Sequence, residues 1–500
     1  MIAIKATSIN LSDEQKKLVN YNEGEGSLLV VAAAGSGKTR ILTERVRYLL
    51  TEKIGKFSVL CLTFTKKAAE EMKERLSSVP DIARRAYIGT IHEFAFQMIA
   101  DRREMLGFPD VPHIIDRDQD RKKILEQVFT ENPLLSNSYK NENAKIQQAK
   151  LNETLNLISE RKRSLDTVVD ENEEQSFIYE TYNQLLREQN MIDYDDILFF
   201  AYKLLTESQA NARLYQRLYR YILIDEAQDL SFAQYHLIKA ICGENHKNIF
   251  MVGDPKQAIH SYAGADTKFM LQDFIHDFNA KQDKITKNYR SSKKVIELAN
   301  SIMQNGSNSE DAHYQGIAEV KSFKSEEDEA LWIISQIKNF VLNKGTDKEI
   351  EGIISLDKIA ILARNKFVFS AIDKLLSEDT FFKNKYFIKK ATDGLDLETD
   401  FIKAFDLGTR ILSNTANQLH FQEILKLLKI NYSNGVVFQS SIEKLSAIIN
   451  YVDKENTEQY YFTNILIEGW KALQLEKPMH KVLSDLSITR CSSFLKTEHF

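Results

Sequence analysis

A loop of small residues that ends in lysine and threonine is the strongest chemical signal in the sequence. It connects the apolar run LLVVAA at 28–33 to an amphipathic helix. Glycines let such a loop curl until several N–H groups converge on one anion, and the helix start adds a positive dipole end. The pattern predicts nucleotide binding, with an ordinary glycine-rich turn as the alternative. The predicted binding residues are Ala34, Gly35, Ser36, Gly37, Lys38 and Thr39.

Two adjacent carboxylates form the second signal. Asp225 and Glu226 lie where the apolar run YILID at 221–225 ends. Parallel α/β sheets bind ligands at the carboxyl ends of their strands, so this pair is expected to face the loop. Asp225 would ligate Mg²⁺ together with Thr39, and Glu226 would be the general base that orients the attacking water. Many helix caps also read Asp-Glu after an apolar run, so the prediction depends on the loop.

A parallel sheet would bring these two signals together. Continuous apolar, β-branched runs are typical of strands that are buried on both faces. Between the second and third of these runs the apolar spacing is helical, which indicates a helical insertion. The predicted fold is therefore α/β. The expected strands are at 28–33, 58–65, 221–225 and 249–254, with weaker ones at 318–323, 358–363 and 386–391.

The composition is that of a globular protein and excludes several classes. The chain has 500 residues, a net charge of −5, 6 prolines and 18 glycines. Few breakers favour helices over an all-β fold, and the charge excludes a histone-like protein. Three cysteines without a CxxC pair argue against a disulfide framework or a cysteine-rich zinc site. Since neither a signal peptide nor a membrane span is visible, a cytoplasmic protein without a membrane partner is predicted.

Eight ordered motifs resemble those of the UvrD/Rep/PcrA-type superfamily 1 DNA helicases. Single motifs of this kind are weak indicators, whereas eight in the right order are specific. The resemblance implies ATP and Mg²⁺ as cofactors, and a P-loop NTPase fold with tandem RecA-like parallel sheets and large helical insertions. The motifs are LSDEQKKLV at 11–19, VVAAAGSGKTRIL at 30–42, LTFTKKAAEEMKERL at 62–76, GTIHEFAFQMI at 89–99, DYDDIL at 193–198, DEAQD at 225–229, VGDPKQAIHSYAGAD at 252–266 and NYRSS at 288–292.

The resemblance also implies further nucleotide contacts. Gln15 resembles the glutamine that reads the adenine edge, because an amide donates and accepts together; a solvated helix glutamine is the alternative. Arg40 and Tyr289 are similar to the pair that flanks the adenine ring. Gln257 resembles the residue that senses the γ-phosphate and links it to DNA. Arg290 resembles the arginine that reaches the γ-phosphate across the cleft, and a surface ion pair is its alternative.

Aromatic residues carry the implied DNA contacts. Phe64 and Tyr262 resemble the family's base-stacking residues, and such stacking tolerates any base sequence; a core position is the alternative for each. His92 and His260 have a structural histidine as the alternative reading. The residues that the resemblance assigns to DNA are Phe64, Thr65, His92, His260, Tyr262 and Arg364.

Two departures from the family pattern matter. Where the family has a tyrosine, a tryptophan and an arginine after VGDPKQ, this chain has His260, Tyr262 and Ala263. The stacking platform is smaller and one cationic contact is absent, so a weaker or differently tuned grip on single-stranded DNA is expected. After Ala391 no segment resembles the motifs that close the second RecA-like domain. That domain is therefore expected to be incomplete, in a fragment or in a naturally short helicase.

The resemblance finally implies a function and a division into domains. The chain is predicted to be an ATP-dependent helicase or translocase that moves 3′ to 5′ on single-stranded DNA or on a duplex with a single-stranded tail. The alternatives are a DNA-sensing ATPase that regulates a partner nuclease, as in bacterial Gabija defence, and an inactive scaffold; a repair protein is another possible partner. The predicted segments are a first RecA-like domain at 1–92 and 206–304, its helical insertion at 93–205, the start of a second RecA-like domain at 305–395 and a second helical insertion at 396–500.

Overall fold

The computed structural model describes most of the chain between residues 11 and 475. Statements about structure concern these residues. The gaps within this range are residues 22, 54, 166–172, 244–245, 304–307, 313, 343–352, 380, 383–399, 415, 431–437, 439 and 453–456.

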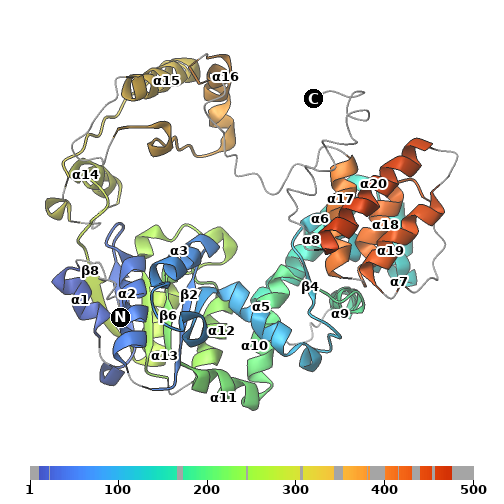
Figure 1. The fold of residues 1–500 in the computed structure, drawn as a ribbon, viewed down its shortest axis with the longest axis horizontal. Helices are drawn as coiled ribbons and strands as arrows, with labels where there is room; N and C mark the ends of the chain where they lie inside the picture. The colour runs from blue at the N-terminus through green and yellow to red at the C-terminus, as the bar shows by residue number, and fades with distance from the viewer. Residues whose placement is uncertain are drawn as a thin grey trace.

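A six-stranded parallel sheet organises the N-terminal part of the chain (Figure 1). Its strands are β1 (Leu28–Ala32), β2 (Ser58–Thr63), β3 (Ala86–Thr90), β6 (Tyr219–Ile224), β7 (Ile249–Gly253) and β8 (Lys281–Ile285). The order β3-β2-β6-β7-β1-β8 places β1 between two strands that come much later in the chain. Leu28 pairs with Phe250 on one side and with Lys281 on the other. Because all strands run in the same direction, their carboxyl ends meet at one edge.

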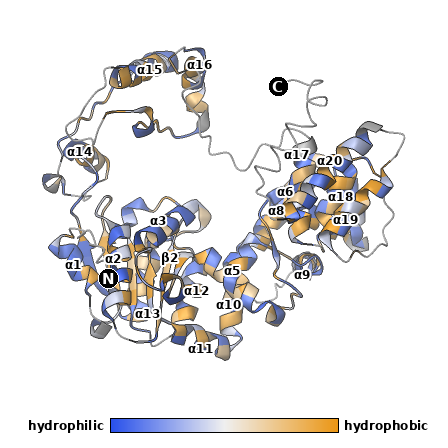
Figure 2. Ribbon diagram, in the orientation of Figure 1, coloured by the Kyte–Doolittle hydropathy of each residue, from blue (hydrophilic) through white to orange (hydrophobic). Residues whose placement is uncertain are grey.

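Helices cover both faces of this sheet, as its apolar strands require. They are α1 (Asp13–Val19), α2 (Lys38–Glu52), α3 (Lys66–Leu76), α4 (Ile82–Arg85), α5 (Ile91–Asp101), α10 (Tyr194–Thr206), α11 (Gln209–Leu218), α12 (Phe232–Cys242) and α13 (Phe274–Phe278). In β1, Leu28 and Val30 pack with α1, α2 and α3, whereas Leu29 packs with α5, α10 and α12 on the other face. Figure 2 shows the region of β2 in the hydrophobic colour. The predicted α/β fold with strands buried on both faces is confirmed.

The two edge strands, β3 and β8, are not predicted from the sequence. In β8, which reads KQDKI, only Ile285 is buried. Strand β3, AYIGT, lies in the stretch that is expected to be helical. An edge strand has one neighbour and one open side, and polar side chains there protect it against pairing with other chains. A search for continuous apolar runs therefore misses β8. It also misses β3, because the run AYIGT is short and is interrupted by Gly89 and Thr90.

The helical insertion between β3 and β6 has a hydrophobic core of its own. Its helices α6 (Asp118–Glu131), α7 (Pro133–Asn141), α8 (Ala144–Arg163) and α9 (Glu173–Glu188) enclose Ile124, Leu155 and Tyr182. It also holds a two-stranded parallel sheet of β4 (His113–Ile115) and β5 (Met191–Asp193), which are too short to stand out in the sequence. Helices α5 and α10 pack under the main sheet instead. We therefore propose that the separately packed body of the insertion consists of the residues between α5 and α10 in the sequence.

A cluster of buried charges joins the helices of the insertion to the start of α10. Lys162 in α8 is fully buried, and its Nζ lies 2.8 Å from both Asp193 Oδ2 and Asp196 Oδ1. The hydroxyl of Tyr182 in α9 donates to Asp193 at 3.2 Å, and Arg121 Nη2 in α6 lies 3.6 Å from the same oxygen. Burial disfavours the ionised form of Asp193, but Lys162 and Arg121 outweigh this effect and lower its pKa.

The C-terminal helices form a further packed body. They are α17 (Asp400–Ser413), α18 (Gln418–Leu427), α19 (Ser441–Ala447) and α20 (Thr457–Gln474). Trp470 is fully buried at its centre, and its indole N–H donates to Phe405 O at 3.1 Å. Figure 1 places this body beside α6 and α8, and Leu419 of α18 belongs to the core of the insertion. The helical character predicted for 396–500 is confirmed where that range is described.

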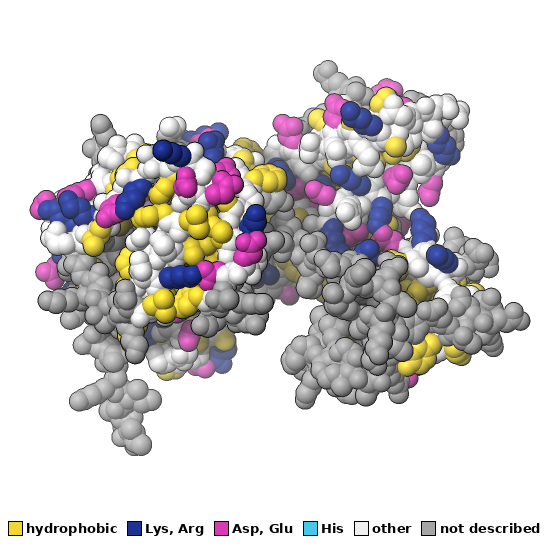
Figure 3. Space-filling model, turned by 90° about the horizontal axis from the view of Figure 1, so that it is seen from above, with side chains coloured by type: hydrophobic (Ala, Val, Ile, Leu, Met, Phe, Trp, Pro, Cys, Tyr) yellow, Lys and Arg dark blue, Asp and Glu magenta, His cyan; other side chains and the backbone are white. Residues whose placement is uncertain are grey.

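Helix α14 (Lys293–Ile302) is followed by α15 (Glu326–Leu342) and α16 (Ser370–Glu378). The described residues of 308–382 contain no strand. The expected strands at 318–323 and 358–363 have no strand partner there, so the second of the predicted tandem sheets is not formed by the described residues. A strand needs hydrogen bonds from a neighbour, and without one Val320 and Leu362 are 85% and 92% exposed. Figure 3, which views the molecule of Figure 1 from above, shows hydrophobic side chains gathered on the surface. The third expected strand, 386–391, lies outside the described residues.

Two of the three cysteines lie in the core around the sheet. Cys61 in β2 and Cys242 in α12 are buried free thiols, and burial raises the pKa of each. A thiol that stays protonated is a poor nucleophile, so neither is suited to covalent chemistry. Cys491 lies outside the described residues.

Among the helices that the structure describes, none combines the length and the apolar character that a membrane crossing requires.

The Lys162 cluster yields a prediction about stability. The substitution Lys162→Met removes the ammonium that contacts both buried carboxylates, of which, among the described residues, only Asp193 keeps a second cation in Arg121, and this should cost about 3–5 kcal/mol of unfolding free energy. Lys203→Met removes the α10 member of a partly exposed ion pair with Glu207, the residue after this helix, and should cost about 0–1 kcal/mol. Urea unfolding of the parent and both variants measures the difference. Equal losses in the two variants would show that the buried cluster contributes no special stability.

Candidate active site

The loop after β1 depends on two glycines with positive φ. Gly35 has a φ of 71° and Gly37 of 85°, a region that residues with a Cβ rarely adopt. A Cβ on Gly35 would also come within 2.8 Å of Asn288 Cγ. Ser36 between them is fully buried, and its hydroxyl has no hydrogen-bond partner among the described residues. The loop is therefore a tight curl with a buried hydroxyl group inside it.

Four side chains meet where β1 and β6 end. Lys38 Nζ lies 3.1 Å from Glu226 Oε2, and the hydroxyl of Thr39 donates to Asp225 Oδ2 at 3.1 Å. Lys38 and Asp225 are buried, whereas the Glu226 side chain is 34% exposed. Glu226 has a φ of 49°, so the chain turns sharply after β6. A non-glycine residue held in this conformation costs free energy, and such residues cluster at functional sites.

The carboxylate of Asp225 has the surroundings of a magnesium ligand. Burial raises its pKa to about 7, and the neighbouring Glu226 adds to the effect. Hydrogen bonds from the Glu226 N–H, at 3.0 Å, and from Thr39 act in the opposite direction. Carboxylate and hydroxyl oxygens are the donors that Mg²⁺ prefers. Thr39 and Asp225, the two metal ligands predicted from the sequence, thus lie together and fit that ion.

The residues expected around the adenine lie beside the loop. Gln15 Nε2 donates to Ser36 O at 3.0 Å, and its Oε1 accepts from the backbone N–H that precedes α1. Both ends of this amide therefore have partners in the structure. Tyr289 N–H donates to Gly35 O at 2.8 Å, and Arg40 is half-buried on the first turn of α2. Contact of these residues with an adenine remains a prediction.

Asn288 ties the loop to the segment after β8. Its Nδ2 donates to Ala34 O at 2.8 Å, and its Oδ1 accepts from the N–H groups of Arg290 and Ser291, both at 2.8 Å. Sequence analysis assigns Asn288 no role, although it belongs to the motif NYRSS. Its place directly before Tyr289 and Arg290 is the signal that points to it. Asn288 thus holds the backbone of Arg290 in place relative to the loop.

The segment after β7 carries Gln257 and leads to an exposed aromatic group. Gln257 Nε2 donates to Asp254 Oδ2 at 2.7 Å. Further along, His260 stacks on Phe64, with ring centroids 4.9 Å apart, and its Nδ1 lies 3.3 Å from the hydroxyl of Tyr262. Phe64 is 38% exposed and Tyr262 is 83% exposed, so neither is a core residue.

A second aromatic pair lies at the starts of α5 and α10. His92 stacks on Tyr194 with centroids 4.5 Å apart, and Tyr194 is 50% exposed. Burial lowers the pKa of His92 to about 4, so its ring is neutral at neutral pH. Tyr194 belongs to the motif DYDDIL, but sequence analysis assigns it no role. Its exposed ring beside His92 makes it a further candidate for contact with a flat ligand.

Three other predicted residues have different surroundings. Thr65 caps α3, because its hydroxyl accepts from Ala68 N–H at 3.2 Å. Arg290 is exposed, and its guanidinium has neither a hydrogen bond nor an ion pair with the described residues. Arg364 is also exposed, and among the described residues no contact joins it to the Phe64 group. The structure brings the N-terminal DNA candidates to one sheet edge but does not bring Arg364 to them.

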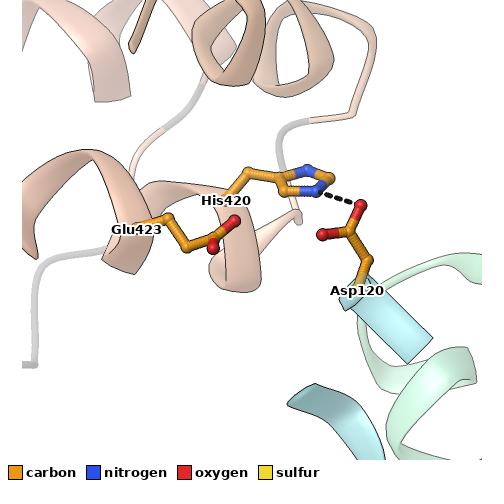
Figure 4. A group of neighbouring side chains, drawn as sticks. All are labelled: Asp120, His420 and Glu423. Atoms are coloured by element: carbon orange, nitrogen blue, oxygen red, sulfur yellow. Dashed lines mark hydrogen bonds and ion pairs between the residues drawn. The ribbon is translucent and has the colours of Figure 1, made fainter. Parts of the chain in front are cut away.

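A polar cluster between α6 and α18 is a second possible metal site (Figure 4). Ligand atoms of Asp120, His420 and Glu423 lie within 4.8 Å of one another. His420 Nδ1 accepts from Asn417 Nδ2 at 2.6 Å, so its other nitrogen, 3.2 Å from Asp120 Oδ2, carries the proton. The ammonium of Lys123 forms an ion pair with Glu423. Because a proton and an ammonium already face these carboxylates, we interpret the cluster as a contact between the insertion and the C-terminal helices.

The sheet and its loop define the class of protein. A parallel sheet whose first strand enters a Gly-Ser-Gly-Lys-Thr turn and a helix, with a second strand that ends in Asp-Glu, is the arrangement of a P-loop NTPase. Residues 11–279 match the UvrD/REP helicase N-terminal domain, and residues 284–460 match the UvrD-like helicase C-terminal domain. The chain therefore belongs to the UvrD/REP helicase family, as the eight motifs indicate.

Curated relatives carry the name ATP-dependent DNA helicase PcrA. The protein of Staphylococcus aureus strain Mu50 is 30% identical over 474 residues, which are 90% of this chain and 59% of the relative. The protein of Staphylococcus epidermidis strain ATCC 12228 is 28% identical over 453 residues, 87% of this chain and 58% of the relative. The chain thus spans somewhat more than half the length of these relatives.

Asn288 yields a prediction about the site. Asn288→Ala removes one donor and one acceptor and with them the partly buried hydrogen bonds to Ala34, Arg290 and Ser291, which should cost about 1–3 kcal/mol of stability. Limited proteolysis should then cut more readily near Arg290, since that segment keeps the Tyr289 N–H bond to Gly35 as a backbone attachment to the loop but loses the side-chain bond of Asn288 to Ala34. Asn464→Ala, which removes an exposed hydrogen bond within α20, serves as the control. A protease-resistant Asn288→Ala variant as stable as its parent would contradict the assignment.

Proposed function

We propose that this chain is an ATP-dependent DNA helicase or translocase that acts on single-stranded DNA. The observation that carries the proposal is the position of the Lys38–Glu226 pair at the same sheet edge as the exposed Phe64–His260 stack. In this proposal, one edge would hold the nucleotide and also bind the bases. Movement from 3′ to 5′, and a duplex with a single-stranded tail as substrate, are inferred from the family resemblance. ATP and Mg²⁺ are the proposed cofactors.

The proposed hydrolysis uses residues of the loop and of the turn after β6. In the structure Lys38 and Glu226 neutralise each other at 3.1 Å. Phosphate oxygens in the loop would attract the ammonium of Lys38 and leave the Glu226 carboxylate as a base. Glu226 would then accept a proton from water as the water oxygen bonds to the γ-phosphorus and the bond to the ADP oxygen breaks. Mg²⁺ at Thr39 and Asp225 would offset phosphate charge, as would the exposed Arg290.

The proposed DNA surface follows from what lies at the strand ends. Phe64 follows β2, His92 follows β3, and His260 and Tyr262 follow β7. Exposed aromatic rings bind bases by stacking irrespective of sequence. Basic side chains such as Lys66, which is largely exposed at the start of α3, would add contacts with phosphates.

A DNA-sensing ATPase that regulates a nuclease or a repair protein is the second candidate. The observation that favours it is the small aromatic surface of Phe64, His260 and Tyr262. It is followed by Ala263, where the family has an arginine. Such a surface could detect DNA without the grip that strand separation needs. A strand-displacement assay beside an ATPase assay distinguishes the two, because the regulator would hydrolyse ATP in response to DNA and leave the duplex intact.

The nucleotide site yields the first functional prediction. Lys38→Ala removes a charged hydrogen-bond donor worth about 1.5–3 kcal/mol, so affinity for ADP–Mg²⁺ should fall by tenfold or more. Glu226→Gln should retain that affinity and lower the rate of phosphate release by about 10²–10⁴. Calorimetry and a phosphate-release assay measure the two effects, with Lys203→Met as the control. Unchanged nucleotide affinity in Lys38→Ala would overturn the assignment of the loop.

The aromatic surface yields the second functional prediction. Phe64→Ala and Tyr262→Ala should each weaken the binding of single-stranded DNA by about 1–3 kcal/mol, whatever the base sequence. Phe177→Ala, at an exposed aromatic residue of α9, should leave affinity unchanged. Fluorescence anisotropy with oligonucleotides of two sequences measures the affinities, and raising the salt concentration should lower them steeply. Affinity that is insensitive to salt and to both substitutions would exclude this surface.

A further inference from the structure

The amide of Gln228 lies between the two strand ends that carry the candidate machinery. Gln228 belongs to the short 3₁₀ turn Ala227–Asp229 after β6 and is 2% exposed. Its Nε2 donates to Glu226 Oε2 at 2.9 Å and to Asp229 Oδ2 at 3.3 Å. Its Oε1 accepts from the backbone N–H of Asp254 at 2.9 Å. One buried side chain therefore connects the turn after β6 with the turn after β7.

The chemistry of these contacts requires an amide. A donor must face the carboxylates of Glu226 and Asp229, and an acceptor must face the N–H of Asp254. A carboxylate could accept from Asp254 but would repel Glu226, and an apolar side chain would leave all three groups without this partner. Glutamine meets both needs at this distance from the backbone.

The neighbouring strand leaves room for this side chain. Gly253 is the last residue of β7, and a Cβ there would lie 2.8 Å from Gln228 Oε1 and 3.1 Å from Gln228 N. Both distances are shorter than real Cβ atoms tolerate comfortably, and one of them involves the backbone. The close approach of Gln228 to β7 therefore depends on glycine at this position.

A continuous row of polar contacts passes through Gln228. Lys38 contacts Glu226 at 3.1 Å, Glu226 accepts from Gln228 at 2.9 Å, and Gln228 accepts from Asp254 at 2.9 Å. Asp254 in turn accepts from Gln257 at 2.7 Å. The chain then continues directly into His260 and Tyr262. The row thus extends from the phosphate-binding loop to the segment that carries the aromatic group.

We propose that Gln228 is a positioning residue that holds the Glu226 carboxylate and couples its placement to the segment after β7. The inference rests on the proposed function, since it assigns a role within that ATPase. When the aromatic segment shifts on a bound strand, Asp254 shifts with it, and the Gln228 amide moves the Glu226 carboxylate relative to the loop. Gln228 itself contacts neither nucleotide nor DNA.

The test uses Gln228→Glu and Gln228→Leu in the full chain. Misplacement of a reacting group by about 1 Å can cost 10²-fold in rate, so kcat should fall by about 10²-fold. The KM for ATP and the affinity for ADP–Mg²⁺ should stay within threefold of the parent, because Lys38 and the loop are untouched. The ratio of DNA-stimulated to basal ATPase should fall towards one. Loss of stability alone would lower basal and stimulated rates together and leave this ratio unchanged.

Gln234→Glu is the matched control. Gln234 is also buried, six residues further along, and its Oε1 accepts from Ser231 N–H at 2.9 Å in the cap of α12. Glutamate can make the same bond, so this variant should keep the parental kcat and stimulation ratio. Urea midpoints of all variants show whether each is folded. The Gln228 variant whose stability is closer to that of the parent decides whether the positioning role holds.

A double variant tests the coupling itself. If Gln228 and Gln257 act along one row, Gln228→Leu with Gln257→Ala should lose no more stimulation than the worse single variant. If the losses of the two single variants multiply in the double variant, the two residues act independently and the coupling is overturned. A parental ratio in the Gln228 variant that is closer to the parent in stability would overturn the positioning role. If the parent chain does not hydrolyse ATP, the proposed function is contradicted. Calorimetry of ADP binding separates that outcome from a failure of the positioning role of Gln228.

Discussion

Lys38, Asp225 and Glu226 meet at the carboxyl edge of the sheet, and burial makes their separation costly. A buried charge persists only where an opposite charge or hydrogen bonds compensate it. The pairing therefore requires that the helix after β1 and the turn after β6 come together across the end of β7. Gly35, Gly37 and the left-handed turn at Glu226 are what the backbone needs to bring these groups within 3.1 Å. The apolar strands and the helices on both faces supply the rigid support for this contact.

Sequence reasoning succeeds where a local pattern has one physical cause. The runs at β1, β2, β6 and β7 are apolar because those strands are buried on both faces, and the sheet is found there. It fails at β8, whose edge position permits KQDKI, and at Tyr194, whose value lies in its stacking on His92 from a distant helix. The Asp120–His420 contact joins residues 300 positions apart, and no spacing rule reaches so far. The roles of the site residues toward nucleotide and DNA come from the family resemblance.

The contacts between the insertion and the C-terminal helices are largely polar. Arg117 pairs with Asp406 at 3.1 Å, His420 bonds to Asp120, and Asn414 donates to Gln189 O at 2.9 Å. Leu419 adds an apolar residue to the insertion core. Interfaces of this kind within one chain resemble transient ones, in contrast to the apolar cores of the bodies that they join. The contact between the insertion and the C-terminal helices therefore differs in kind from the apolar packing inside each of these two bodies.

The strand order has a consequence for how the chain matures during synthesis. Strand β1 emerges from the ribosome early, yet its neighbours β7 and β8 begin only at Ile249 and Lys281. Until then the run Leu28–Ala32 is an unpaired apolar strand. Strand β2 can pair early with β3 on one side but waits for β6 on the other side across the whole insertion. The insertion, with its own core, can fold in the interval, whereas the sheet closes late through contacts between distant residues. The nascent chain therefore exposes the apolar strand β1 and one side of β2 throughout this interval, which makes it the period in which a chaperone would matter most.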